Sequence, residues 1–161
     1  MKKAIYAGSF DPITNGHLDI LTKACTVFDD VIVGVLSNPL KKYLFTLEER
    51  IGIIKSVTGH LENIEIKSFY GALVDFAEQE EAYTIIRGLR SVSDYEYELQ
   101  LALTNRALNS KVETIFFIPD LGNQFVSSTI VREIARLGKD ISQFVPTNIV
   151  DIICKKVKEN S

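Results

Sequence analysis

The chain has 161 residues, a length that suits one domain with a substantial core and excludes two large ones. Hydrophobic residues make up 46% and charged residues 24% of it, values that exclude a disordered or fibrous protein. A formal net charge of −3 argues against a general nucleic-acid binder, because such proteins usually carry an excess of Lys and Arg. We therefore expect a single domain over residues 1–161, in which any anion site is a local cluster of cations.

The cysteines and the N-terminus point to an ordinary cytoplasmic protein. Cys25 and Cys154 lie in apolar helical contexts without CxxC spacing, so we interpret them as buried structural thiols. Met1 and two lysines lead directly into a short apolar run, which lacks the form of a signal or transit sequence. No apolar run is long enough to span a bilayer, so we expect no contact with membranes.

Predicted strands and helices alternate along the chain. Apolar runs predict strands at 4–7, 31–36, 64–66, 83–86 and 114–118. Helical spacing, capping residues and prolines predict helices at 18–25, from Thr46 onward, at 73–77, 92–108 and 127–137, and after Pro146. This alternation predicts an α/β fold: a doubly wound, Rossmann-like, five-stranded parallel sheet with helices on both faces and a C-terminal helix.

The predicted helix at 92–108 needs a buried side against the sheet. Helical periodicity places a set of mainly apolar residues on that side: Tyr95, Leu99, Ala102, Leu103 and Leu108.

Residues 8–17, Gly-Ser-Phe-Asp-Pro-Ile-Thr-Asn-Gly-His, connect the first predicted strand to the first predicted helix. In a parallel sheet this connection lies at the carboxyl edge, where ligands bind and the free N–H groups of the helix attract anions. Gly8 allows close approach to a ligand, Pro12 stiffens the turn, and Gly16 leaves room beside the first helical turn. His17 would then lie where a phosphate binds; the alternative is an ordinary turn with a surface histidine.

Residues that favour phosphate follow four of the five predicted strands: Ser9 and His17, Lys41 and Lys42, Arg87 and Arg90, and Ser127, Ser128 and Thr129. The carboxyl ends of parallel strands share one edge, so these residues should converge and bind more than one phosphate. The alternatives are a solvated lysine pair and a simple helix N-cap at 127–129. Arg87 directly follows an apolar strand and requires an anion there, while Gly88 permits a turn that brings Arg90 alongside.

The missing motifs narrow the chemistry. The sequence shows no Ser-His-Asp order, no HExxH and no EF-hand, and it lacks the phosphate-loop pattern G-x-x-x-x-G-K-[ST]. These absences disfavour a hydrolase with a general base and a common kinase. Nucleotidyl transfer fits better, because an incoming phosphate monoester is already ionised and requires no general base. His17 and Lys41 could stabilise the α-phosphate as pyrophosphate leaves.

Thr14-x-Gly16-His17 resembles the T/H-x-G-H signature of the nucleotidylyltransferase superfamily. Four blocks together resemble the bacterial phosphopantetheine adenylyltransferase family over essentially the whole chain: YAGSFDPITNGH at 6–17, FTLEER at 45–50, IRGLR at 86–90 with YEYE at 95–98, and SST at 127–129. The resemblance implies transfer of AMP from ATP to 4′-phosphopantetheine, giving dephospho-CoA and pyrophosphate. It also implies Mg²⁺, a homohexamer, and inhibition by coenzyme A. Because Mg²⁺ often prefers phosphate oxygens and water, we expect it to bind mainly through the ATP phosphates, with no protein metal site.

The resemblance also implies roles for individual residues. The implied catalytic residues are His17, Lys41 and Arg90. The implied ATP-binding residues are Ser9, Phe10, His17, Gly88, Leu89, Arg90, Glu98, Asn123, Gln124, Phe125, Val126, Ser127, Ser128 and Thr129. The implied phosphopantetheine-binding residues are Ser9, Lys41, Leu73 and Arg87.

This sequence departs from the family pattern at two places. Ser9 replaces the threonine of many members, and the 120–124 loop lacks a tryptophan found in some. Two other hypotheses remain: a sister transferase that uses another phosphorylated acceptor, such as nicotinamide mononucleotide or glycerol 3-phosphate, and a non-catalytic nucleotide-binding regulator.

Overall fold

The computed structural model describes residues 2–160, apart from the side chains of residues 92 and 93. The strands are β1 (Lys3–Gly8), β2 (Asp30–Leu36), β3 (Ile64–Phe69), β4 (Thr84–Gly88) and β5 (Glu113–Phe117). The α-helices are α1 (Asn15–Val27), α2 (Leu47–Thr58), α3 (Leu73–Gln79), α4 (Val92–Leu108), α5 (Ser128–Arg136) and α6 (Val150–Glu159). Short 3₁₀ turns occupy Leu121–Asn123 and Thr147–Ile149.

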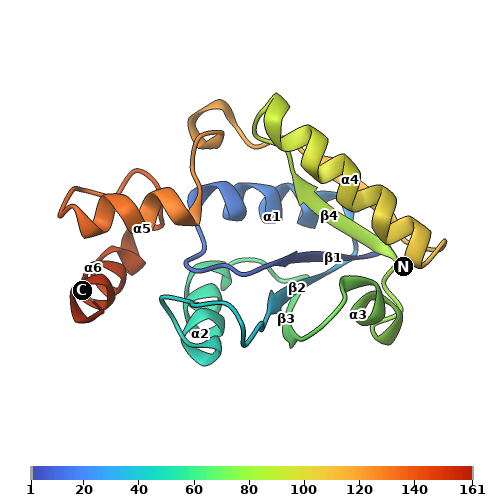
Figure 1. Ribbon diagram of the computed structural model, residues 1–161, viewed down its shortest axis with the longest axis horizontal. Helices are drawn as coiled ribbons and strands as arrows, with labels where there is room; N and C mark the ends of the chain where they lie inside the picture. The colour runs from blue at the N-terminus through green and yellow to red at the C-terminus, as the bar shows by residue number, and fades with distance from the viewer. Residues whose placement is uncertain (1, 161) are drawn as a thin grey trace.

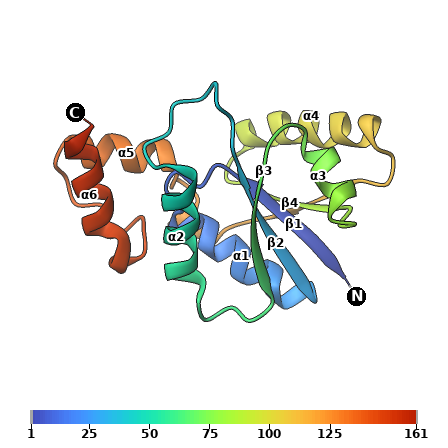
Figure 2. The same cartoon turned by 90° about the horizontal axis from the view of Figure 1, so that it is seen from below.

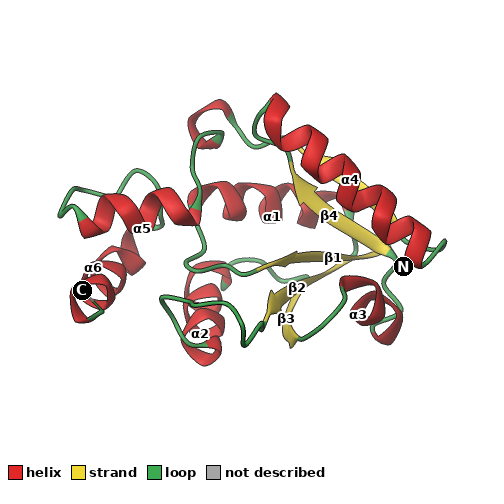
Figure 3. Ribbon diagram, viewed as in Figure 1, coloured by secondary structure: helices red, strands yellow, loops and turns green. Residues whose placement is uncertain are grey.

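The strands form one parallel sheet in the order β3-β2-β1-β4-β5, which confirms the predicted fold class. The chain builds the sheet outward from β1 to β3 and then crosses to β4 on the other side of β1. The strand order therefore reverses between β1 and β4, the place where doubly wound sheets usually bind ligands. Figure 3 shows the loop that follows β1 leading from the sheet toward α5 before it enters α1.

Alternate residues of β1 enter two separate cores. Tyr6 packs with α1, α2, α5 and α6 on one face, whereas Ile5 packs with α3 on the other. Figures 1 and 2 show this layering, with α1 and α2 on one side of the sheet, α3 and α4 on the other, and α5 and α6 beyond its carboxyl edge.

Helix α4 has the predicted bounds, but the prediction for its buried side was wrong. Tyr95, Leu99, Leu103 and Leu108 are exposed, and Ala102 is only half-buried. Among the described side chains of α4, only that of Glu98 belongs to a buried residue. Helical periodicity located a stripe of apolar residues but could not reveal that this stripe points away from the sheet.

Strand β4 extends further than predicted, because Arg87 and Gly88 belong to the strand and not to the turn. A Cβ at Gly88 would lie only 2.2 Å from Cδ1 of Ile20 on α1. A side chain at this position would therefore displace the end of Ile20, so Gly88 permits the close packing of β4 on α1 and does not form the sharp turn that we expected. In the described part of the chain, no helix is long and apolar enough to cross a membrane.

Candidate active site

Three connected pockets surround the carboxyl ends of β1 and β4. The central pocket is lined by Tyr6, Ala7, Gly8, Phe10, Thr14, Gly16, His17, Ile20, Arg87, Gly88, Arg90, Glu98, Pro119 and Val126. The cationic pocket is lined by Ser9, Phe10, Asp11, His17, Lys41, Lys42, Tyr43, Arg90, Ser127, Ser128, Thr129 and Arg132. The apolar pocket is lined by Ala7, Gly8, Leu36, Phe69, Gly71, Leu73, Arg87, Leu101, Ala102, Asn105 and Thr114. His17 and Arg90 border both the central and the cationic pocket.

The imidazole of His17 is held in one tautomer by the start of α1. The backbone N–H of Thr14 donates to Nδ1 of His17 at 3.0 Å, so the proton of the neutral ring lies on Nε2. Burial, with smaller contributions from Arg90 and Arg87, lowers the pKa of His17 to about 4. At neutral pH His17 is therefore an uncharged hydrogen-bond donor.

The N–H groups at the start of α1 are less available to anions than expected. The N–H of Asn15 donates to the carbonyl oxygen of Phe144 at 2.9 Å, and that of His17 donates to the hydroxyl of Thr14. Thr14 and His17 thus form a reciprocal capping box. These two N–H groups are therefore already paired, and the nearby cationic side chains are the donors that remain for a phosphate.

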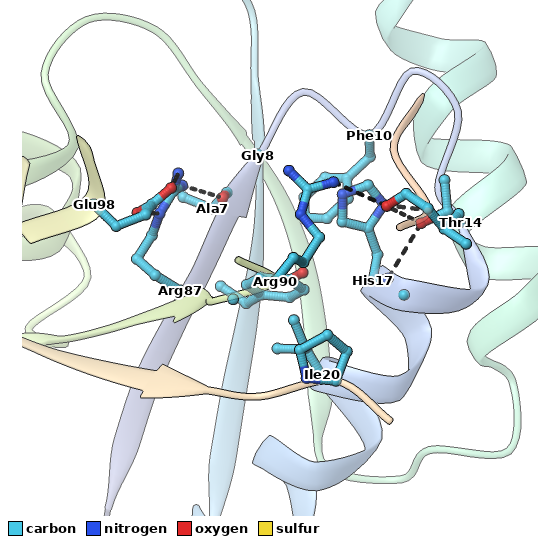
Figure 4. Close-up of a pocket in the computed structure, with 14 residues that line it drawn as sticks. Ala7, Gly8, Phe10, Thr14, His17, Ile20, Arg87, Arg90 and Glu98 are labelled. Carbon is cyan, nitrogen blue, oxygen red and sulfur yellow. Dashed lines mark hydrogen bonds and ion pairs between the residues drawn. The ribbon is translucent and has the colours of Figure 1, made fainter. Parts of the chain in front are cut away.

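Arg87 and Arg90 have different surroundings. Two nitrogens of Arg87 donate to the carboxylate of Glu98 at 2.7 Å each, so the anion required by this arginine comes from α4 itself. A third donates to the carbonyl of Ala7. Arg90 is held by the carbonyl of Val126 at 2.9 Å and by Asp94 at 3.3 Å. Figure 4 shows the Arg87–Glu98 pair on one side of Gly8 and Arg90 with His17 on the other.

The cationic pocket brings together segments far apart in the sequence. Lys41 and Lys42 come from the loop after β2, and Arg132 comes from α5. The hydroxyl of Ser127 caps α5 by accepting from the N–H of Ile130, and that of Ser128 donates to the carbonyl of Pro12. The N-cap interpretation of Ser127 is therefore correct, while Ser127 also faces the pocket.

Most of the predicted site residues line these pockets, and some do not. The exceptions are Leu89, Asn123, Gln124 and Phe125. The N–H of Leu89 donates to the carbonyl of Phe117. Phe125 is largely exposed and packs edge-on against Phe144, with ring centroids 5.9 Å apart. Glu98 does reach the central pocket, but both of its oxygens already accept from Arg87.

Sequence reasoning missed three residues of the cationic pocket. Asp11 accepts from the N–H groups of Leu44 and Phe45, which ties the first loop to the end of the second. Arg132 donates to the carbonyl of Asp11. Arg132 lies four residues after Ser128, so helical spacing could have placed it on the same face of α5. No comparable sequence signal pointed to Tyr43.

Known proteins are similar in sequence to this chain over nearly its whole length. The cytidylyltransferase-like family matches residues 5–134. A phosphopantetheine adenylyltransferase from Desulfatibacillum aliphaticivorans is 52% identical over 98% of this chain and 90% of its own length. Another, from Nautilia profundicola, is 51% identical over 92% of this chain and 96% of its own.

This chain belongs to the phosphopantetheine adenylyltransferase family. It is accordingly a nucleotidyltransferase. A crystal structure from Vibrio parahaemolyticus, named for nicotinate-nucleotide adenylyltransferase, superposes with a TM-score of 0.75 at 16% identity, covering 100% of this chain and 98% of that one. This likeness supports the fold alone.

Proposed function

We propose that this single domain transfers AMP from ATP to 4′-phosphopantetheine, giving dephospho-CoA and pyrophosphate. The observation that carries the proposal is that His17 and Arg90 line two adjoining pockets at once. Groups at such a junction can contact the α-phosphate while the nucleoside and the remaining phosphates lie on either side of it. The names of the two relatives support the same pair of substrates.

Each substrate portion has a pocket of suitable chemistry. We place the nucleoside in the central pocket and the phosphates in the cationic pocket, beside Lys41, Lys42 and Arg132. The pantetheine arm fits the apolar pocket, where Leu73 lies among apolar side chains. Arg87 borders both the central and the apolar pocket, so it lies where the acceptor phosphate would meet ATP.

Catalysis then requires positioning and charge stabilisation. An oxygen of the ionised acceptor phosphate attacks the α-phosphorus of ATP, and the bond between that phosphorus and the oxygen bridging to the β-phosphate breaks. No proton has to be removed from the acceptor, which suits a neutral His17 that donates from Nε2 to an α-phosphate oxygen. Arg90 and Lys41 stabilise the charge that develops on the departing pyrophosphate.

We propose that Mg²⁺ reaches the site on the triphosphate. This ion usually retains several waters and binds substrate phosphates, and the lysines and arginines of the cationic pocket suit the remaining phosphate charge. Bound there, Mg²⁺ would screen the negative charge of the β- and γ-phosphates. Because ATP and coenzyme A precursors are intracellular metabolites, we place the enzyme in the cytoplasm, and we retain coenzyme A as a candidate feedback inhibitor.

The exposed apolar residues of α4 support self-association. Leu99 and Leu103 lie one turn apart on α4, and both are exposed, as is Leu108 near its end. Large apolar side chains that gather on one side of a protein often mark a protein interface. We therefore propose that this surface joins copies of the chain, in keeping with a homohexamer.

A substrate comparison tests the proposed reaction. With ATP, 4′-phosphopantetheine should release pyrophosphate and form dephospho-CoA, whereas nicotinamide mononucleotide and glycerol 3-phosphate should release none. Turnover of either alternative acceptor in preference to phosphopantetheine would favour a sister transferase. ATP binding without pyrophosphate release for any acceptor would favour a regulator.

A further inference from the structure

Arg50, on α2, is a buried cation outside the three pockets. Only 2% of this residue is exposed, and its Nε is buried without a hydrogen-bond partner. Among the described residues, no carboxylate lies within ion-pair distance of it. A buried, incompletely satisfied charge is unfavourable for folding compared with an apolar side chain of similar size. Its presence therefore requires an explanation other than stability.

The contacts of Arg50 join the ends of two neighbouring strands. Its Nη1 donates to the carbonyl of Ser9, just after β1, at 2.7 Å, and to the carbonyl of Leu36, the last residue of β2, at 2.9 Å. Ser9 begins the loop that leads to His17. Leu36 precedes the loop that carries Lys41. One nitrogen thus fixes the starting points of both loops.

The same guanidinium also holds the second loop further along. Its Cζ lies 4.0 Å from the centroid of the Tyr43 ring, and the Tyr43 hydroxyl accepts from the N–H of Asn38 at 3.2 Å. Tyr43 in turn lines the cationic pocket, and Nζ of Lys41 lies 5.8 Å from its ring centroid. A chain of contacts therefore runs from Arg50 through Tyr43 to Lys41.

We propose that Arg50 is a positioning residue for the adenylyl-transfer reaction, which sets the distance between Ser9 and Lys41 across the cationic pocket. It acts through the two carbonyls and the Tyr43 ring and does not touch substrate. This inference rests on the proposed function, since the distance matters only if phosphates bind between the two loops. A planar guanidinium is needed because it stacks with its face and donates with its edge at the same time, which an ammonium cannot do.

Three substitutions test this role. Arg50→Met removes the donors and the charge, and Arg50→Lys retains the charge without the planar geometry. Both should lower kcat, by at least about 30-fold for Arg50→Met and about tenfold for Arg50→Lys, because small displacements of positioning groups have large effects on rate. Arg136→Met, at the exposed end of α5, is the matched control and should retain wild-type kcat.

A double-mutant cycle separates positioning from general damage. If Arg50 acts through Lys41, Lys41→Ala should lower kcat much less in the Arg50→Met protein than in wild type. Multiplicative effects of the two substitutions, or wild-type kcat in Arg50→Lys, would overturn the proposal. Circular dichroism and thermal melting establish that each variant is folded. If Arg50→Met does not fold, Tyr43→Leu replaces it in the cycle, with the same two outcomes.

A binding measurement keeps this test independent of the reaction. Calorimetric titration with pyrophosphate should show weaker binding in Arg50→Met, again with a reduced additional effect of Lys41→Ala. If the variants show this coupling in pyrophosphate binding while the wild-type protein transfers no AMP to phosphopantetheine, the result would contradict the proposed reaction and support the positioning role. Unchanged pyrophosphate binding in a folded Arg50→Met protein would contradict the positioning role.

Discussion

Helices α1 and α4 flank the switch point on opposite faces of the sheet, and they are built differently. Helix α1 begins with a capping box between Thr14 and His17, and it buries Ile20 and Leu21 in the core. Helix α4 is longer, but Leu99, Leu103 and Leu108 point outward, and among its described side chains only that of Glu98 belongs to a buried residue. One helix fixes the proposed catalytic histidine through its capping box, and the other fixes an arginine by an ion pair and leaves an exposed apolar surface.

Among these predictions, replacing His17 on α1 should have the largest effect on kcat. We expect His17→Ala to lower kcat by about 10²–10³-fold with little change in ATP affinity, since the imidazole acts mainly in the transition state. Steady-state kinetics and calorimetric titration with ATP measure the two quantities. His60→Ala, in an exposed loop, should match wild type. An unchanged kcat in His17→Ala would remove this residue from the mechanism.

The burial of His17 should also appear in the pH dependence of stability. Its pKa is about 4 when folded and about 6.5 when unfolded, so the unfolded chain takes up the proton first as the pH falls. The stabilisation is complete above pH 6.5 and is lost toward pH 4. Between pH 7 and 4.5, wild type should lose about 2 kcal/mol more of its free energy of unfolding than His17→Asn does. Parallel denaturation curves for the two proteins would contradict the assigned pKa.

On the α4 side, breaking the ion pair should have a smaller effect. Glu98→Gln removes the charge that holds Arg87, so this arginine should lose its orientation between the central and apolar pockets. We expect KM for phosphopantetheine to rise about tenfold with a modest loss of kcat, in line with about 1.5 kcal/mol for a charged hydrogen bond. Glu96→Gln, exposed on the same helix, is the control. A selective rise in the KM for ATP instead would place Arg87 on the nucleotide.

The outward surface of α4 should matter least for the chemistry. Leu103, which is 60% exposed, lies on the surface that we propose joins the subunits. Leu103→Glu should dissociate the oligomer in sedimentation velocity, while activity per subunit stays within about threefold of wild type, because Leu103 lines none of the three pockets. Leu137→Glu, at the exposed end of α5, should leave the oligomer intact. Persistence of the oligomer in Leu103→Glu would place the interface elsewhere.

The sequence by itself determined the parallel α/β fold, the order of its elements and the convergence of His17, Lys41 and Arg90 on one edge. These depend on local periodicity, on capping residues such as Thr46, and on the rule that parallel strands end together. The tertiary structure alone decided that Glu98 neutralises Arg87 and that Gly88 packs against Ile20. It also decided that the large apolar side chains at 99, 103 and 108 of α4 are exposed, and that Arg50 reaches two strand ends. Each of these joins residues distant in the chain through side-chain packing, and no local pattern specifies which distant partner a side chain will meet.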